Sequence, residues 1–282
     1  MNDSTTEMSR HRTVITPASG WIAIRWAELW QYRSLLWVFT WRDIKVRYKQ
    51  TLFGFAWAVA GPIASMVVFT VIFGKLANFE SQTGDLPYAL IVFTGLMPWS
   101  FFTGVMSQAS NSLVGNAGLL TKVYFPRLLI PVSGIGSKMV DFMIAFAVFL
   151  CLMIYYGVMP TASILLAPFI LLAMTALALG VGMFFAALIV KVRDFAMILS
   201  YFTTLWMWLT PVVYPASVIS EQWRWLLDYN PMYGLIINFR ASLLGTEMEW
   251  GSLGIALAIT TVMLIFGMYF FTRVERTFAD VV

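Results

Sequence analysis

Charged residues are scarce in this 282-residue sequence: Asp, Glu, Lys and Arg make up 11% of it, while 60% of its residues are hydrophobic. Soluble domains contain roughly 25% charged and about 45–50% apolar residues, so the composition excludes an ordinary soluble domain. The apolar residues are concentrated in runs of about 20, the length that a helix needs to cross the hydrocarbon core of a bilayer. We therefore expect a polytopic membrane protein with a single membrane domain.

Cysteine and histidine each occur once, as Cys151 and His11. One cysteine cannot form a disulfide within the chain, and a metal site built on His and Cys needs several such ligands. We therefore expect no internal disulfide and no metal site. The N-terminal residues are polar and lack the apolar core and cleavage site of a secretory signal peptide.

Six apolar runs are predicted to be transmembrane helices, because backbone groups in lipid are satisfied only within helices or closed barrels, and barrel-like alternation is missing here. The runs are 53–74, 86–107, 139–158, 164–190, 195–213 and 253–272. The predicted fold is all-α. We expect a disordered cytoplasmic tail at 1–20, an amphipathic interface helix at 21–50, the six-helix domain at 51–276 and a C-terminal cytoplasmic tail at 277–282.

Asp, Glu, Lys, Arg and His are absent from five of these runs, and the run 139–158 contains only Asp141 of these residue types, close to Lys138. Ion-coupled transporters usually carry ionisable groups at membrane depth, so a proton or ion relay is not expected. A phosphate-binding GxxxxGK[ST] loop is also missing, since the glycines and lysine of GIGSKM (134–139) have the wrong spacing. If this protein transports actively, the energy must come from another subunit.

The basic residues are distributed asymmetrically. With both termini on one side, fifteen of the 18 Lys and Arg residues lie on that side, and only Lys75, Arg224 and Arg240 lie on the other. Cytoplasmic segments carry the excess of Lys and Arg. Both termini are therefore expected in the cytoplasm.

The densest basic cluster, WRDIKVRYKQ (41–50), directly precedes the first apolar run. A helical wheel places Arg42, Lys45 and Lys49 on one face, and Asp43 and Arg47 are spaced to pair at i,i+4. A separate aromatic face contains Trp26, Trp30, Trp37, Trp41, Ile44 and Tyr48. Such a helix lies in the bilayer interface next to anionic headgroups. It is either a membrane anchor or a docking surface for a cytoplasmic partner.

Aromatic residues are frequent in the second and fifth runs. They either face lipid and neighbouring helices or line a channel in which sugar rings stack, because Trp and Tyr combine an apolar face with a polar edge. The candidate channel residues are Trp99, Phe101, Phe102, Tyr201, Trp206, Trp208 and Tyr214. The fifth run ends at LTPVVYP (209–215), and the more polar segment that follows predicts short re-entrant helices at the outer leaflet, with a break at Pro231.

Four segments are distinctive in combination: RDIKVRYKQTLFGFAWAVAGP (42–62), NAGLLTKVYFPRLLIP (116–131), VRDF (192–195), and TPVVYP, NPMYG and FR within 210–240. In this order and spacing they resemble the permease subunit of ABC-2 type polysaccharide exporters, which move O-antigen, capsule or teichoic acid. The resemblance covers roughly 32–276. It implies a homodimer in the bacterial inner membrane with two copies of a separate cytoplasmic ATPase, which would hold ATP and Mg²⁺, while this chain binds no cofactor.

The resemblance also implies roles for individual residues. Contact with the ATPase is expected from Arg42, Lys45, Arg47, Lys49, Asn116, Lys122, Tyr124 and Arg127. The resemblance implies that the cargo is a glycan linked to a lipid such as polyprenyl pyrophosphate. The candidate phosphate partners are Lys45, Arg47, Lys49 and Arg127, because cations bind phosphate strongly. Anionic membrane lipids would account for the same charges. Nucleic acid is not an expected partner.

Other functions are less consistent with the sequence. A permease for capsule, teichoic acid, lipid or drug export is the nearest alternative. A membrane-embedded glycosyl- or acyltransferase needs a positioned titratable group, and Asp141, Glu221 and Asp228 lack an evident base or metal partner. A passive channel would need rings of polar or charged lining residues, which the apolar runs do not supply. A transporter subunit, not an enzyme, is therefore expected.

Overall fold

The computed structural model of this chain describes residues 26–49, 54–82, 84, 86–120, 122 and 125–275. Within these residues the chain is helical and forms no strand, which confirms the predicted all-α fold. The two expected tails, the first residues of the interface helix and Tyr124 lie outside the described residues. The helices in chain order are α1 (Trp26–Gln31), α2 (Arg33–Lys49), α3 (Gly54–Phe69), η1 (Thr70–Leu76), η2 (Phe79–Gln82), α4 (Tyr88–Gly115), α5 (Ala117–Leu120), α6 (Leu129–Tyr156), η3 (Ala162–Leu166), α7 (Ala167–Lys191), α8 (Phe195–Leu209), η4 (Ala216–Val218), η5 (Glu221–Trp223), α9 (Arg224–Asp228), α10 (Pro231–Leu244) and α11 (Trp250–Glu275).

Five helical segments of the described chain are long and apolar enough to cross a membrane: Ala56–Leu76, Tyr88–Gly115, Leu129–Tyr156, Ala162–Lys191 and Trp250–Val274. They correspond to five of the six predicted runs. The remaining run, 195–213, forms the shorter apolar helix α8. Its 15 residues correspond to about 22 Å at 1.5 Å per residue, less than the roughly 30 Å of a hydrocarbon core. The helix ends early because Thr210 precedes a proline and is extended, the conformation that a following proline favours.

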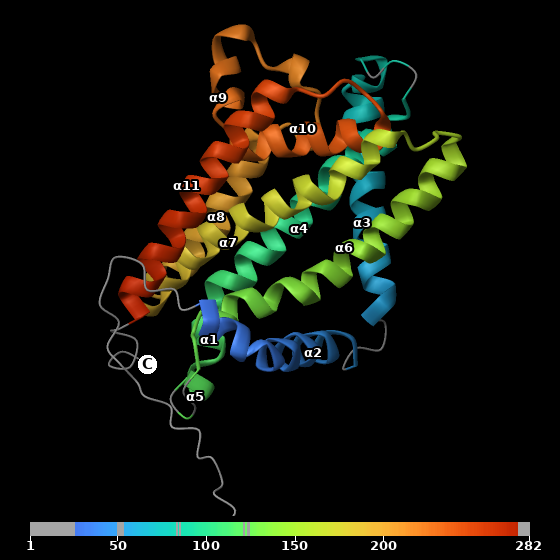
Figure 1. Cartoon of the computed structure of the whole chain (residues 1–282). Coiled ribbons are helices and arrows are strands. Elements are labelled where there is room, and N and C mark those ends of the chain that lie inside the picture. Colours follow the sequence, from blue (N-terminus) through green and yellow to red (C-terminus); the bar gives the residue numbers. More distant parts are fainter. Residues whose placement is uncertain are drawn as a thin grey trace, which may run out of the picture.

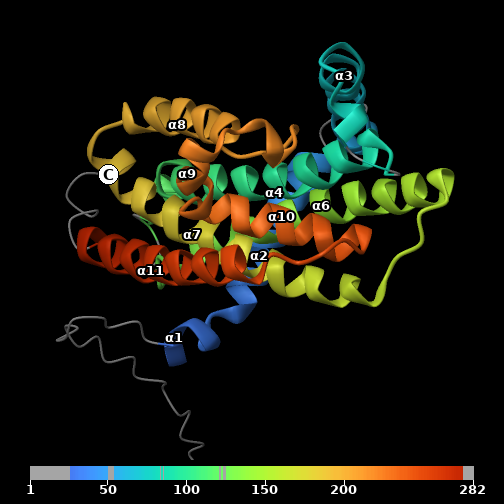
Figure 2. The ribbon, with the colours of Figure 1, turned by 90° about the horizontal axis from the view of Figure 1, so that it is seen from above.

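The long helices form a bundle with one helix lying across each end (Figure 1). In Figure 1, α2 lies beneath α4 and α6, and α10 lies across the opposite end, above α4 and α7. Figure 2 shows α3 and α8 on the same side of α4, at the edge of the bundle. We call the two ends the α2 end and the α10 end.

Helix α4 forms the centre of the core. Its buried side chains include Phe93, Phe102 and Met106, and they pack with residues of α6, α7 and α10 in one hydrophobic cluster. By contrast, α3 with its extension η1 buries only Met66 and Gly74 among the side chains that the structure describes there. The α3 segment therefore makes few buried contacts, and most of its described side chains are partly or fully exposed.

Small residues set the closest helix crossings. At the crossing of α7 and α11, a Cβ atom added to Gly267 would lie 2.0 Å from the carbonyl oxygen of Gly180, so the two backbones are in contact. Close approach through small residues is a main source of helix association in lipid, where there is no hydrophobic effect between helices.

The interface helix is divided at Tyr32, where a turn separates α1 from α2. Helix α2 packs against α6 and the residues just before it. The ring centroid of Phe39 lies 5.6 Å from that of Phe125, which precedes α6, and the Thr40 hydroxyl donates to the carbonyl of Ser133 in α6 at 3.1 Å. A Cβ at Gly136 would lie 2.2 Å from the methyl group of Thr40. Glycine at this position therefore allows α2 to lie directly on α6.

We predict that Gly267→Ala destabilises the protein by roughly 1–3 kcal/mol, the usual cost of overpacking a close contact. The control is Gly254→Ala on the same helix, where an added Cβ meets no atom within 4 Å and better helix propensity should leave stability unchanged or raise it. Thermal unfolding in detergent measures both. Equal unfolding temperatures for the two variants would contradict the proposed α7–α11 contact.

Candidate functional site

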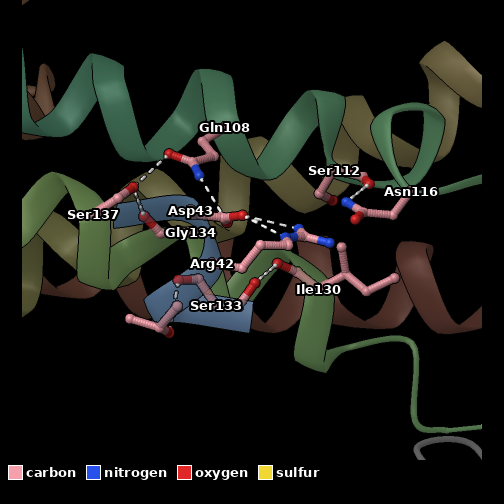
Figure 3. Close-up of polar contacts among 10 residues, drawn as sticks. Arg42, Asp43, Gln108, Ser112, Asn116, Ile130, Ser133, Gly134 and Ser137 are labelled. Carbon is pink, nitrogen blue, oxygen red and sulfur yellow. Dashed lines mark hydrogen bonds and ion pairs between the residues drawn. The ribbon is translucent and has the colours of Figure 1, made fainter. Parts of the chain in front are cut away.

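A polar recess of about 580 Å³ opens at the α2 end between α2, α4 and α6. Its lining includes charged groups from α2 and amide and hydroxyl groups from α4 and α6 (Figure 3). The lining residues are Arg42, Asp43, Val46, Arg47, Gln108, Asn111, Ser112, Gly115, Asn116, Ile130, Ser133 and Ser137.

Asp43 and Gln108 connect the three walls of the recess. Asp43 accepts a hydrogen bond from Arg42 Nη2 at 2.9 Å and another from Gln108 Nε2 at 3.3 Å. The amide oxygen of Gln108 accepts from the Ser137 hydroxyl at 3.1 Å, as Figure 3 shows. A Cβ at Gly134 would lie 2.7 Å from Cγ of Gln108. The GIGSKM segment thus lies within α6, where Gly136 allows close approach of α2 and Gly134 allows close approach of α4.

Asp141 is the second connection between α2 and α6. It accepts a hydrogen bond from the Tyr48 hydroxyl at 2.5 Å, forms an ion pair with Arg47 at 2.7 Å, and lies 3.8 Å from the ammonium of Lys138. Burial, together with the hydrogen bond to the Asp141 carboxylate, raises the pKa of Tyr48 to about 12. The one acidic residue of the predicted spans therefore binds the interface helix to the bundle.

The structure places the predicted ATPase-contact residues in different surroundings. Arg42, Arg47 and Asn116 line the recess. Lys45 and Lys49 are exposed on α2, Lys122 is exposed after α5, and Arg127 is half-buried before α6. All lie at the α2 end, where Figure 1 also shows α5. The recess thus brings together three of the eight residues, and Tyr124 lies outside the described residues.

The charges of the recess are largely compensated within the chain. Arg42 is paired with Asp43 and Arg47 with Asp141, so a phosphate would have to compete with an existing carboxylate at either position. This weakens Arg47 as a phosphate partner. Lys45, Lys49 and Arg127 stay predictions for that role.

The seven predicted channel aromatics do not form one surface. Trp99, Phe101 and Phe102 are buried in the core, where Trp99 and Phe102 pack edge-on against Trp206 at 6.3 and 5.2 Å between ring centroids. Rings enclosed in this way cannot stack on a sugar, because their faces already contact protein. Tyr201 and Trp208 are 69% and 50% exposed on α8, and the Tyr214 hydroxyl donates to the carbonyl of Trp208 at 2.7 Å.

Asn230 holds the break that follows α8. Its side-chain oxygen accepts from Trp206 Nε1 at 2.9 Å and from the backbone N–H of Met232 at 3.1 Å, and its amide donates to the hydroxyl of Thr210 at 2.9 Å. The bond to Met232 makes Asn230 the N-cap of α10, directly before Pro231 at the first helical position. The predicted break at Pro231 is confirmed as the start of α10.

Arg240 is a functional candidate that the sequence analysis treated as an ordinary loop cation. Its Nη2 donates to the carbonyl of Val212 at 2.9 Å, and its Nε is buried without a hydrogen-bond partner in the described structure. A Cβ at Gly95 would lie 2.0 Å from that same carbonyl and 2.8 Å from Arg240 Nη2. Burial lowers the pKa of Arg240 to about 10, so the side chain stays charged at neutral pH. The signal in the sequence was one arginine within the otherwise uncharged α10.

We predict that Arg240→Met destabilises the protein by roughly 1–3 kcal/mol, because the Val212 carbonyl loses its donor in a buried setting. The matched control is Arg224→Met, which removes an exposed cation at the same end. Thermal unfolding in detergent and limited proteolysis of segment 210–215 measure the effect. An Arg240→Met variant as stable and as protease-resistant as the control would show that the contact does not hold this segment.

Comparison with known proteins agrees with this architecture. The profile of the family described as ABC-2 type transporter matches residues 34–244. A Klebsiella pneumoniae protein named O-antigen export system permease protein RfbA is 27% identical over 88% of this chain and 95% of its own length, and a Myxococcus xanthus protein of the same name is 30% identical over 84% and 91%. The Escherichia coli polysialic acid transport protein KpsM is 23% identical over 83% and 91%. The matched region runs from α2 to the end of α10, and this chain belongs to the ABC-2 type transporter family.

Proposed function

We propose that this chain is the membrane subunit of an ATP-driven exporter of lipid-linked polysaccharide, most closely of the O-antigen type. It moves the glycan from the cytoplasmic to the outer side of the bacterial inner membrane. The observation that carries the proposal is the similarity to proteins named O-antigen export permeases over 84–88% of this chain. The expectation that the chain is no enzyme belongs to the same proposal, as does the absence of a bound cofactor.

The α2 end is the proposed cytoplasmic side and the contact surface for two copies of an ATPase. The excess of Lys and Arg in the segments at that end supports this orientation, with both termini in the cytoplasm. The polar recess opens at that end, and α5 extends beyond the bundle there (Figure 1). Because Asp43, Gln108 and Asp141 join α2 to α4 and α6, a displacement of α2 by the ATPase would be passed directly to two spans.

The glycan path is proposed to lie between two copies of the chain. The buried rings of Trp99, Phe101 and Phe102 argue against a path through the middle of one copy. The exposed rings of Tyr201 and Trp208 on α8 are the better candidates for contact with sugars. Since α3 and α8 lie on the same side of α4 (Figure 2), a second copy facing that side would enclose both helices.

Capsule polysaccharide is the second candidate cargo. The similarity to a polysialic acid transport protein supports it, but that identity, 23%, is lower than the 27–30% shared with O-antigen permeases. The two cargo classes therefore need a direct comparison.

The proposal is tested by complementation. The chain is co-expressed with a candidate partner ABC ATPase from the same genome in two hosts that lack their own permease, one producing lipid-linked O-polysaccharide and one producing capsule. We expect surface polysaccharide in the first host, measured by antibody labelling of intact cells, and none when the ATPase lacks its phosphate-loop lysine. Export of capsule alone would favour the second candidate, and export of neither by an assembled complex would refute the proposal.

We predict that Lys122→Glu weakens co-purification with the ATPase at least about ten-fold, because reversing a charge at an interface places like charges together. The control is Lys75→Glu, which reverses an exposed charge at the α10 end and should leave co-purification unchanged. Pull-down of the ATPase from detergent extracts measures both. Equal recovery with the two variants would remove the loop after α5 from the proposed contact.

A further inference from the structure

A large apolar groove lies on the opposite face of α2 from the polar recess. It has a volume of about 1040 Å³ and is bounded by α2, α3 and α6. On α2, the lining residues are Trp37, Thr40, Trp41 and Ile44, whereas Arg42, Asp43, Val46 and Arg47 face the recess. Helix α2 therefore separates two hollows of opposite character.

The part of the groove that α2, α3 and α6 enclose together matches the depth of one leaflet of a bilayer, whereas the wall on α6 continues to Tyr155. On α3 the wall consists of Val59 and Ile63, and the distance along the helix from its start at Gly54 to Ile63 is about 14 Å at 1.5 Å per residue. That is about half of a hydrocarbon core of roughly 30 Å. The part of the groove enclosed by all three helices thus reaches from the α2 end to the middle of the membrane, which is the depth of an acyl chain of the adjoining leaflet.

The mouth of the groove carries an uncompensated positive charge. The rings of Trp37 and Trp41 are stacked with centroids 6.1 Å apart, and the ammonium of Lys45 lies 5.5 Å from the centroid of the Trp41 ring. Arg42 and Arg47 have carboxylate partners, but no described carboxylate forms an ion pair with Lys45. Exposed Trp side chains next to a cation are typical of the headgroup region of a membrane.

We propose that this groove binds one anionic phospholipid of the leaflet at the α2 end. Its phosphate lies against Lys45 and the edge of Trp41, and an acyl chain fills the space between α3 and α6. Because α3 buries so few of its own side chains, the lipid supplies packing that the protein lacks and holds α3 beside α6. The proposal does not depend on the identity of the cargo. It assigns Lys45, one of the remaining candidates for contact with the glycan's phosphate, to a membrane phospholipid instead.

The test is native mass spectrometry of the full chain equilibrated with equal amounts of phosphatidylglycerol and phosphatidylcholine. We expect one retained lipid per chain, with phosphatidylglycerol favoured roughly five-fold, the effect of one basic residue near a membrane surface. Lys45→Gln should abolish the preference. Val140→Trp, which fills the groove, should abolish retention, and Leu172→Trp on α7, which alters a residue 68% exposed outside the groove, should change neither.

A second measurement does not depend on any substitution. Cys151 lines the groove and is the sole cysteine, so a maleimide fluorophore reports on it alone. Phosphatidylglycerol carrying a nitroxide near the end of its acyl chain should quench this label more strongly than the matching phosphatidylcholine. Equal quenching and equal retention of both lipids would overturn the proposal. Preferential retention of a polyprenyl phosphate, or efficient Cys151–Cys151 disulfide formation between two copies in membranes, would also overturn it, because each assigns the groove to another occupant.

Discussion

The attachment of α2 to the bundle is the constraint on which the rest of the structure depends. A helix lying along a membrane surface makes few backbone or apolar contacts that would couple it to the motion of the spans above it. Here Asp141 provides this coupling, since it accepts a hydrogen bond from Tyr48 and pairs with Arg47 and Lys138. Because the carboxylate is half-buried among two cations and a phenol, separating the helices would leave charges without partners, which is costly. The recess on one side of α2 and the groove on the other both exist because this helix is held in place.

At the α10 end a cation, Arg240, has the role that the carboxylate of Asp141 has at the α2 end. The helix α8 stops before it can cross a full bilayer, and the carbonyls of Leu209 and of the non-helical residues that follow it need donors that lipid does not supply. Arg240 and Asn230 provide them, and Tyr88 donates to the carbonyl of Val213. One fixed ionic or polar anchor at each end thus connects the apolar bundle to the short helices that cover it. In the proposed exporter these are the regions that must respond to ATP on one side and release glycan on the other.

The hydrophobic pattern predicted the fold class and five of the long helices because length and apolarity alone decide which segments can cross a membrane. It overestimated the run 195–213, since apolar Val212 and Val213 continue the pattern after the proline has ended the helix. The spacing of Asp43 and Arg47 predicted an ion pair between them. In the structure Asp43 instead accepts hydrogen bonds from Arg42 and Gln108, and Arg47 forms an ion pair with Asp141. The decisive partners come from α4 and α6, and spacing within one helix carries no information about them. The same limit applies to the aromatic residues. Trp99 is buried in the core and Trp208 is exposed, and the sequence alone does not distinguish them.

Hydrogen exchange of α2 tests the central claim most directly. In the full chain, Asp141→Asn should accelerate amide exchange across residues 33–49 by roughly ten-fold or more, since hydrogen bonds to charged groups contribute about 1.5–3 kcal/mol. Exchange in α4 and α7 should be unaffected. The matched control is Glu249→Gln, which alters a carboxylate that also accepts from a tyrosine, Tyr233, but at the α10 end. If α2 exchanges at the same rate in the Asp141→Asn variant and in the wild type, the interface helix is not held by this carboxylate, and the proposed mechanical link between α2 and the spans is wrong.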